Sequence, residues 1–208
     1  MSDNVELTGR TTLSDLTLDE IQIRDPFILN DRSTSIYWLY GSTDKNIWSG
    51  PAGPRRSWRT RPRAPSRPGA TRLTGDLRQS AGTPVFLFNA SEAPWAKPLD
   101  HSATYVTDGP FLFRLTSGHL LMLWSSFGEQ GYAMGIAHSS SGQVTGPWTQ
   151  EEQALWSADG GHGMIVRLRD GRLALTLHQP NTTPDERAII HLLVEHESTI
   201  ALAERVSG

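Results

Sequence analysis

The sequence contains no cysteine. A chain without thiols forms no disulfide framework, no thiolate nucleophile, no zinc–thiolate site and no iron–sulfur cluster. Any chemistry must therefore use carboxylates, histidines, hydroxyls or a hard metal ion. Long apolar runs are also missing, because no stretch approaches the roughly 20 residues of a membrane-spanning helix, and the start, MSDNVELTGR, lacks an export signal. We therefore expect a cytoplasmic protein with no membrane partner.

Acidic residues are absent from residues 51–72, PAGPRRSWRTRPRAPSRPGATR, which hold seven arginines and five prolines. We call this stretch the Arg/Pro tract. Outside it, 12 basic residues face 22 acidic ones, so the formal net charge of −3 conceals an acidic body. Because such a body repels phosphate, the charge pattern argues against a nucleic-acid partner. Binding of nucleic acid or of an acidic partner through the tract, with the β region as scaffold, stays a third alternative to the functions considered below.

The length of 208 residues suits one domain rather than two. We expect residues 1–208 to form a single domain, in which the Arg/Pro tract is a disordered junction.

Three stretches of the chain resemble one another. Each has a polar or Gly-rich entry, an apolar strand, a tight turn and a second strand that ends in small polar residues. Their paired strands are 24–29 with 36–42, 107–114 with 119–126, and 160–168 with 172–179. Further strands are expected at 83–88, 131–138 and 188–195. The pattern predicts an all-β fold.

Repeated hairpins that each begin with a polar residue favour a β-propeller, in which the inner strand of every blade starts at a shared central channel. Asp108 and His162 are 54 residues apart, close to the length of one blade of roughly 40–50 residues. The step from Asp25 to Asp108 is 83 residues, which fits neither one blade nor two. A β-sandwich or jelly roll is the alternative.

Four residues are candidates for chemistry or substrate binding. Asp25 stands between Arg24 and Pro26 at a strand start, where an oriented carboxylate can act as a general base, although Arg-Asp-Pro is also an ordinary turn. His162 is flanked by glycines, which let a ligand approach closely, whereas Asp108 lies in the turn-like Asp-Gly-Pro. Trp48 offers an indole face that stacks on sugar rings, but most tryptophans serve the core.

Several motifs, taken in order, resemble glycoside hydrolase family 43. They are RDPFIL, TDKNIWSGP at 43–51, DGPFLFR, LLMLWSSFGEQGYAMGIAHS at 120–139, GPW at 146–148 and GGHGM at 160–164. The family contains β-xylosidases, α-L-arabinofuranosidases and arabinanases, and its catalytic domain is a five-bladed β-propeller. The resemblance covers residues 20–50 and 72–195. It implies a glycosidase that acts on pentose-containing oligosaccharides or polysaccharides.

The resemblance also implies roles for individual residues. Asp25 matches the family's general base, which activates water in an inverting hydrolysis. His162 matches a central histidine that holds an ion or water, so a single structural cation such as calcium is expected there. Trp48, Asp108 and His162 are expected to contact the substrate.

The chain departs from the family after TDKNIWSGP. The Trp-Ala-Pro-Glu-like motif with the general acid and the Asp-Gly-Thr-like motif with the third carboxylate are both absent, and the Arg/Pro tract stands in their place. Glu92 in Ser-Glu-Ala-Pro copies the acid signature, but its neighbours belong to a later segment, so it is not assigned. We infer an internal deletion or frame error that removed about two blades and left about three recognisable.

Two functions follow from this departure. The first is an active glycoside hydrolase of the arabinose or xylose type. The second is an inactive remnant or sugar-binding module, because a mechanism without its general acid loses roughly 10²–10⁴-fold in rate.

Overall fold

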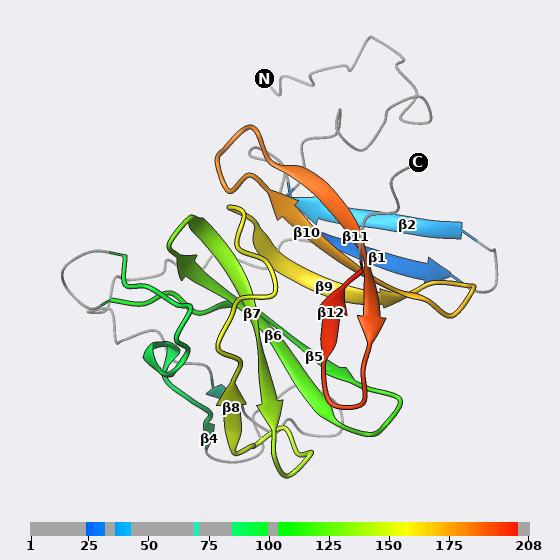
Figure 1. Ribbon diagram of the computed structural model, residues 1–208. Coiled ribbons are helices and arrows are strands. Elements are labelled where there is room, and N and C mark those ends of the chain that lie inside the picture. Colours follow the sequence, from blue (N-terminus) through cyan, green and yellow to red (C-terminus); the bar gives the residue numbers. More distant parts are fainter. Residues whose placement is uncertain (1–23, 32–35, 43–68, 71–84, 100–103, 204–208) are drawn as a thin grey trace, which may run out of the picture.

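The computed structural model describes residues 24–31, 36–42, 69–70, 85–99 and 104–203. Nearly all of the regular structure in these ranges is antiparallel β-sheet (Figure 1). Within the described ranges the one helix is the 3-10 helix η3 at Ala90–Glu92. Among the described residues no helix has the length and apolar character needed to cross a bilayer.

Two sheets of four strands dominate the fold, and each is a meander in which neighbours in sequence are neighbours in space. The first contains β5 (Asp108–Arg114), β6 (Leu120–Gly128), β7 (Gly131–Ser139) and β8 (Trp148–Gln150). The second contains β9 (Gly161–Arg167), β10 (Leu173–Gln179), β11 (Arg187–Glu195) and β12 (Ile200–Leu202). Four-stranded meanders are the blades of a β-propeller.

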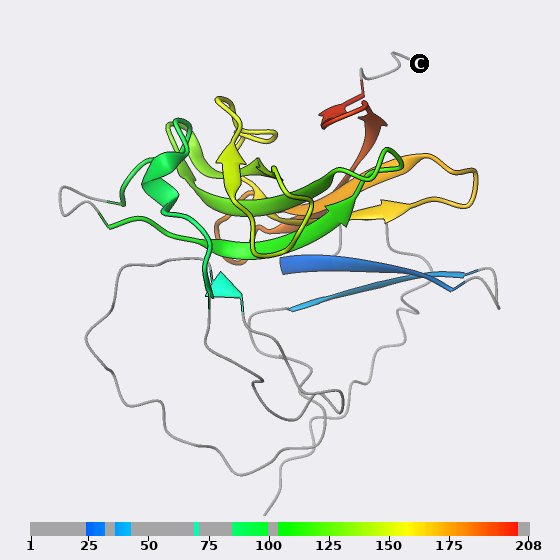
Figure 2. The ribbon, with the colours of Figure 1, turned by 90° about the horizontal axis from the view of Figure 1, so that it is seen from below.

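Two smaller strand pairs accompany these blades. The hairpin of β1 (Arg24–Asp31) and β2 (Ile36–Ser42) packs against β9 and β10 (Figure 2). The pair of β3 (Gly69–Ala70) and β4 (Val85–Phe86) has two residues in each strand. The fold is therefore all-β and of the propeller type, and the described part of the chain contains two four-stranded blades and two shorter strand pairs.

The three predicted hairpins are confirmed, as are the strands expected at 131–138 and 188–195. The strand expected at 83–88 is confirmed only as Val85–Phe86. Strands β8 and β12 were not predicted, because three residues carry too little pattern. Of the Arg/Pro tract only Gly69 and Ala70 are described, and Trp48 lies outside the described residues.

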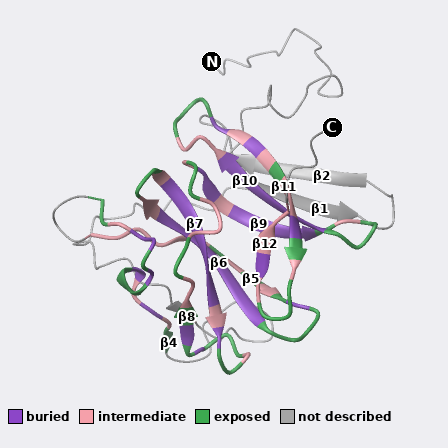
Figure 3. Cartoon of the chain, in the orientation of Figure 1, coloured by how far each residue is buried: buried purple, intermediate pink, exposed green. Residues whose placement is uncertain are grey.

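The main core lies between the two blades. Leu121 and Leu123 of β6 and Leu175 and Leu177 of β10 are completely buried in one cluster there. A second cluster lies on the other side of the first blade, where Trp124 packs beneath residues 87–96. Buried positions therefore run almost without interruption along β6, β7 and β10 (Figure 3). A strand covered on both faces needs such a continuous apolar run, as in LLMLW.

Candidate functional site

The inner strands β1, β5 and β9 share one backbone irregularity, which lies at the first residues of each strand. In each hairpin the inner strand carries one extra residue relative to its partner, which makes a β-bulge. The residue that follows the first pair has a left-handed backbone, with φ of 52° at Asp25, 53° at Gly109 and 52° at His162. The pairs that precede these residues are Arg24–Ser42, Asp108–Ser125 and Gly161–His178.

The shared bulge refines the sequence alignment of the repeats. Asp25 and His162 occupy equivalent positions, and the third equivalent is Gly109 rather than Asp108, which lies one residue earlier. Aspartate and histidine enter the left-handed region more readily than most residues, and glycine does so without strain. A Cβ at Gly109 would also lie 2.9 Å from Cγ of His162, so glycine leaves room for the imidazole.

Three of the four predicted site residues lie around one pocket. Asp25, Asp108 and His162 line a cavity of about 340 Å³, together with Gly109, Pro110, Phe111, Gly163 and Met164. Two carboxylates from different strand pairs thus meet a histidine from a third. All three side chains lie at the bulged starts of the inner strands, and these starts surround the pocket.

The imidazole of His162 lies between the two carboxylates. Its Nδ1 is 3.2 Å from Oδ1 of Asp25 and 3.3 Å from Oδ2 of Asp108. Both neighbours are acceptors, so this geometry assigns a proton to Nδ1. The backbone N–H of His162 donates to Oγ of Ser125 at 2.8 Å, which fixes the bulge to the first blade.

Asp108 receives further hydrogen bonds from its own blade. The hydroxyl of Tyr132 donates to Oδ2 at 2.7 Å, and the N–H of Gly109 donates to Oδ1 at 2.9 Å. The hydrogen bond from His162, with smaller contributions from Tyr132 and Gly109, holds the pKa of Asp108 well below its usual range despite partial burial. Burial and the neighbouring Asp108 carboxylate raise the pKa of Tyr132. Asp108 is therefore an ionised carboxylate near neutral pH and has no proton to donate.

His178 is a site residue that the sequence analysis missed. Its side chain is only 1% exposed, and its Nδ1 lies 3.3 Å from the backbone N of Asp25, which donates to it. Its Nε2 is 3.0 Å from Oδ1 of Asn181. The same Nδ1 lies 3.4 Å from Oδ1 of Asp25, so His178 contacts both the backbone and the carboxylate of that residue. The ring also stacks on Tyr132, with centroids 5.8 Å apart.

The sequence held one signal for His178. It is the only ionisable residue in RLALTLHQ after the opening arginine, in a strand that is otherwise apolar or neutral. Its partner Asp25 is 153 positions away, so no local pattern could join the two.

Glu92 has a local structural role. Its Oε1 accepts from the backbone N of Asn89 at 3.1 Å and from Nδ2 of the same residue at 2.7 Å, which caps helix η3. It is not among the residues that line the pocket of Asp25. This placement agrees with the decision not to assign it as the general acid.

Removing the Tyr132 hydroxyl should weaken the hold on the Asp108 carboxylate. A pKa lowered on folding stabilises the protein above the unfolded value near pH 3.9, and this contribution is lost as pH falls through the folded pKa. We expect Tyr132→Phe to raise the pKa of Asp108, so the stabilisation becomes smaller and its loss is complete at a higher pH. Carboxyl-carbon NMR titration measures this pKa directly. An unchanged Asp108 pKa would contradict the argument, and Asp108→Asn identifies the resonance.

Comparison with known proteins gives structural relatives only, since neither a family model nor a curated protein matches the sequence. The endo-arabinase from Bacteroides thetaiotaomicron VPI-5482 is 44% identical, with a TM-score of 0.58; the match covers 62% of this chain and 47% of the arabinase. A thermostable family-43 glycoside hydrolase is 18% identical, with a TM-score of 0.56 and coverage of 86% and 57%. The α-L-arabinofuranosidase from Lactobacillus brevis is 14% identical, with a TM-score of 0.54 and coverage of 90% and 57%.

These matches show the expected resemblance to glycoside hydrolase family 43 in fold, and the arabinase adds substantial sequence identity. The chain spans about half the length of the arabinase. The other two relatives have too little sequence identity to indicate more than the fold.

Proposed function

We propose that this chain hydrolyses O-glycosyl bonds of arabinose- or xylose-containing oligosaccharides or polysaccharides, with Asp25 as the general base. The observation that carries the proposal is the pocket in which Asp25, Asp108 and His162 converge. The 44% identity to an endo-arabinase supports the choice of a pentose-containing substrate.

The environment of Asp25 suits a base that activates water. Its backbone N–H donates to Nδ1 of His178, and its Oδ1 lies 3.2 Å from Nδ1 of His162. The side chain stays 35% exposed, so water and substrate reach the carboxylate. In an inverting reaction this carboxylate takes a proton from water while the water oxygen attacks the anomeric carbon, and the bond to the leaving oxygen breaks.

The pocket offers no matching general acid among its described residues. Asp25 serves as the base, and the lowered pKa of Asp108 keeps that carboxyl ionised. A leaving alkoxide of a natural sugar needs a proton, whereas an acidic phenol leaves without one. The presence of a base without a general acid also favours the second candidate function, a sugar-binding module that does not hydrolyse its ligand.

Two aryl glycosides with different leaving groups test the proposal. We expect measurable hydrolysis of an arabinofuranoside or xyloside of a strongly acidic nitrophenol, and about 100-fold or more lower rates with unsubstituted phenol. NMR of the first-formed sugar anomer would report inversion. Binding of arabino-oligosaccharide without turnover of either glycoside would support the sugar-binding module instead, and neither turnover nor binding would overturn both.

Calcium in the central channel stays a proposal. Among the described residues, no group of three or more histidine, aspartate or glutamate side chains is arranged to hold a metal ion. Calcium takes roughly six to eight oxygen ligands, and Asp25 and Asp108 would supply only part of that shell. No step of the hydrolysis above depends on it. Adding calcium to chelator-treated protein should raise the melting temperature if the ion binds. An unchanged melting temperature would contradict a calcium site.

A further inference from the structure

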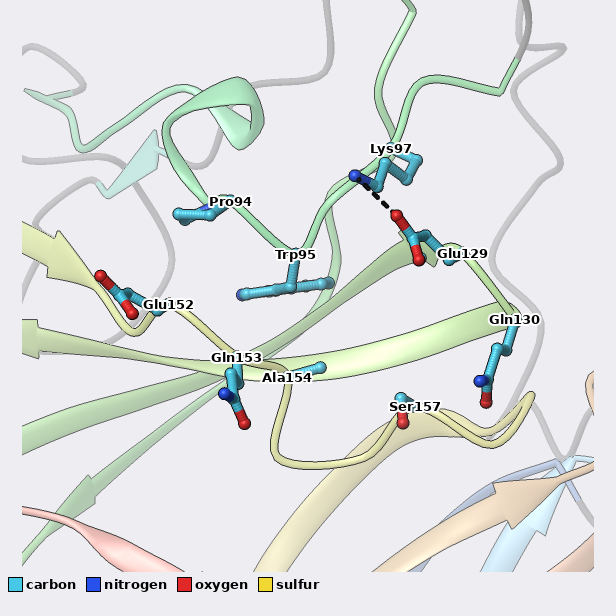
Figure 4. A pocket seen from close by; sticks show the side chains of 10 residues that line it. Pro94, Trp95, Lys97, Glu129, Gln130, Glu152, Gln153, Ala154 and Ser157 are labelled. Carbon is cyan, nitrogen blue, oxygen red and sulfur yellow. Dashed lines mark ion pairs between the residues drawn. The ribbon is translucent and has the colours of Figure 1, made fainter.

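A second pocket, of about 320 Å³, lies apart from the pocket of Asp25 (Figure 4). It is formed by the segment after η3, the turn between β6 and β7, and the segment that follows β8. The two pockets share no lining residue. The residues that line the second one are Pro94, Trp95, Lys97, Gly128, Glu129, Gln130, Glu152, Gln153, Ala154 and Ser157.

The second pocket lies at the same end of the first blade as the Asp25 pocket. Asp108 pairs with Ser125 of β6, and three residues later β6 ends at Gly128, a lining residue of the second pocket. Tyr132, whose hydroxyl reaches Asp108, follows the turn by one residue of β7. A polymer that occupies the pocket of Asp25 therefore meets the second pocket at the same end of the blade.

The indole of Trp95 gives the second pocket a rigid apolar wall. It packs against Trp124 with ring centroids 4.7 Å apart, and a Cβ at Gly135 would collide with it. Only 8% of the residue is exposed, so the ring cannot swing away. Its Nε1 has no acceptor among the described residues and lies at the Glu152 end of the ring in Figure 4.

The other side chains around Trp95 suit a neutral ligand rich in hydroxyl groups. Gln130, Gln153 and Ser157 supply amide and hydroxyl groups that both donate and accept hydrogen bonds. The only cation, Lys97, is paired with Glu129 at 3.2 Å, so the lining does not attract anions. Glu152 and Glu129 stand at opposite ends of the pocket in Figure 4, and no group of three or more metal-ligating side chains that could hold an ion occurs among the described residues.

We propose that this pocket is a second saccharide-binding site, which holds neutral pentose units of the polysaccharide whose other units enter the pocket of Asp25. The inference rests on the proposed function for the choice of sugar. Hydroxyl groups of the saccharide bond to Gln153 and Glu152, and the apolar face of a sugar ring lies against the wall made by Trp95. The site adds affinity for chains longer than the Asp25 pocket alone accommodates.

Calorimetric titration of the full chain with a linear arabino-oligosaccharide tests the second site. The double variant Glu152→Ala/Gln153→Ala removes two exposed side chains, so it leaves the fold intact where Trp95→Ala would not. We expect its Kd to rise about tenfold, the effect of one or two lost hydrogen bonds. The matched control is Thr145→Ala, an exposed residue of the loop between β7 and β8. Its Kd should equal that of the wild type.

The outcomes separate this inference from the proposed hydrolysis. If the double variant binds as the wild type does, or if no oligosaccharide binds, the second site is overturned whether or not aryl glycosides are hydrolysed. If the double variant loses affinity while no glycoside is cleaved, the second site stands and the hydrolysis fails. Competition by inorganic phosphate would overturn the neutral ligand assigned here.

Discussion

Replacing Asp25 by asparagine should lower the rate of hydrolysis of an activated aryl arabinofuranoside by about 100-fold or more. The amide has nearly the shape of the carboxylate, so it can occupy the same place, in which Oδ1 is 3.2 Å from Nδ1 of His162. The backbone N–H of residue 25 still donates to His178. What the variant loses is a group that takes a proton from water, and steady-state kinetics with the nitrophenyl glycoside measures that loss.

The control for Asp25→Asn is Asp185→Asn, a change of the same kind at an exposed position between Pro184 and the start of β11. We expect its kcat/KM and melting temperature to match those of the wild type. Asp25→Asn should melt within a few degrees of the wild type, so lost activity reports chemistry rather than unfolding. Activity within about threefold of the wild type would refute Asp25 as the base, since a positioned base contributes far more than that.

The hairpins were predictable because their information is local. Alternating turn signals and apolar runs placed both strands of each repeat, and the polar entries placed Asp25 and His162 at strand starts. The shared left-handed backbone explains why those two residue types can stand at equivalent positions. The one-residue offset of Asp108 is visible in the sequence, because aligning the Pro-Phe of Arg-Asp-Pro-Phe with that of Asp-Gly-Pro-Phe sets Asp25 against Gly109.

The support behind Asp25 was not predictable, because it is assembled from strands of different hairpins. Tyr132 reaches Asp108 over 24 positions, and His178 reaches Asp25 over 153. The first contact depends on the order of strands within one sheet and the second on how β1 packs against β10, and no periodicity encodes either. The second pocket was not predictable for the same reason, because its lining comes from three separate segments of the chain.

The described contacts form one continuous network on the base side of the reaction. His162 joins Asp25 to Asp108. Tyr132 of β7 donates to Asp108 of β5 in the same blade and stacks on His178, which contacts the backbone of Asp25. The motif expected to carry the general acid would lie where the sequence has the Arg/Pro tract. The described residues of this pocket therefore supply the base side of the proposed reaction but no general acid.

Because this network joins different blades, its geometry depends on the packing between them. Leu175 of β10 is completely buried in the cluster between the two four-stranded sheets. Replacing it by alanine should lower the free energy of unfolding by about 2–5 kcal/mol, through lost burial and the cavity left behind. Urea unfolding followed by tryptophan fluorescence measures this as a lower midpoint with an unchanged slope.

The control for Leu175→Ala is the same substitution at Leu112, which is 39% exposed on β5. We expect Leu112→Ala to cost less than about 1 kcal/mol, because little apolar area leaves water when that side chain folds. Equal losses from the two variants would show that packing between the blades contributes no special stability. A large loss at Leu175 alone, with a single cooperative transition, would show that the two blades fold as one unit and hold the site between them.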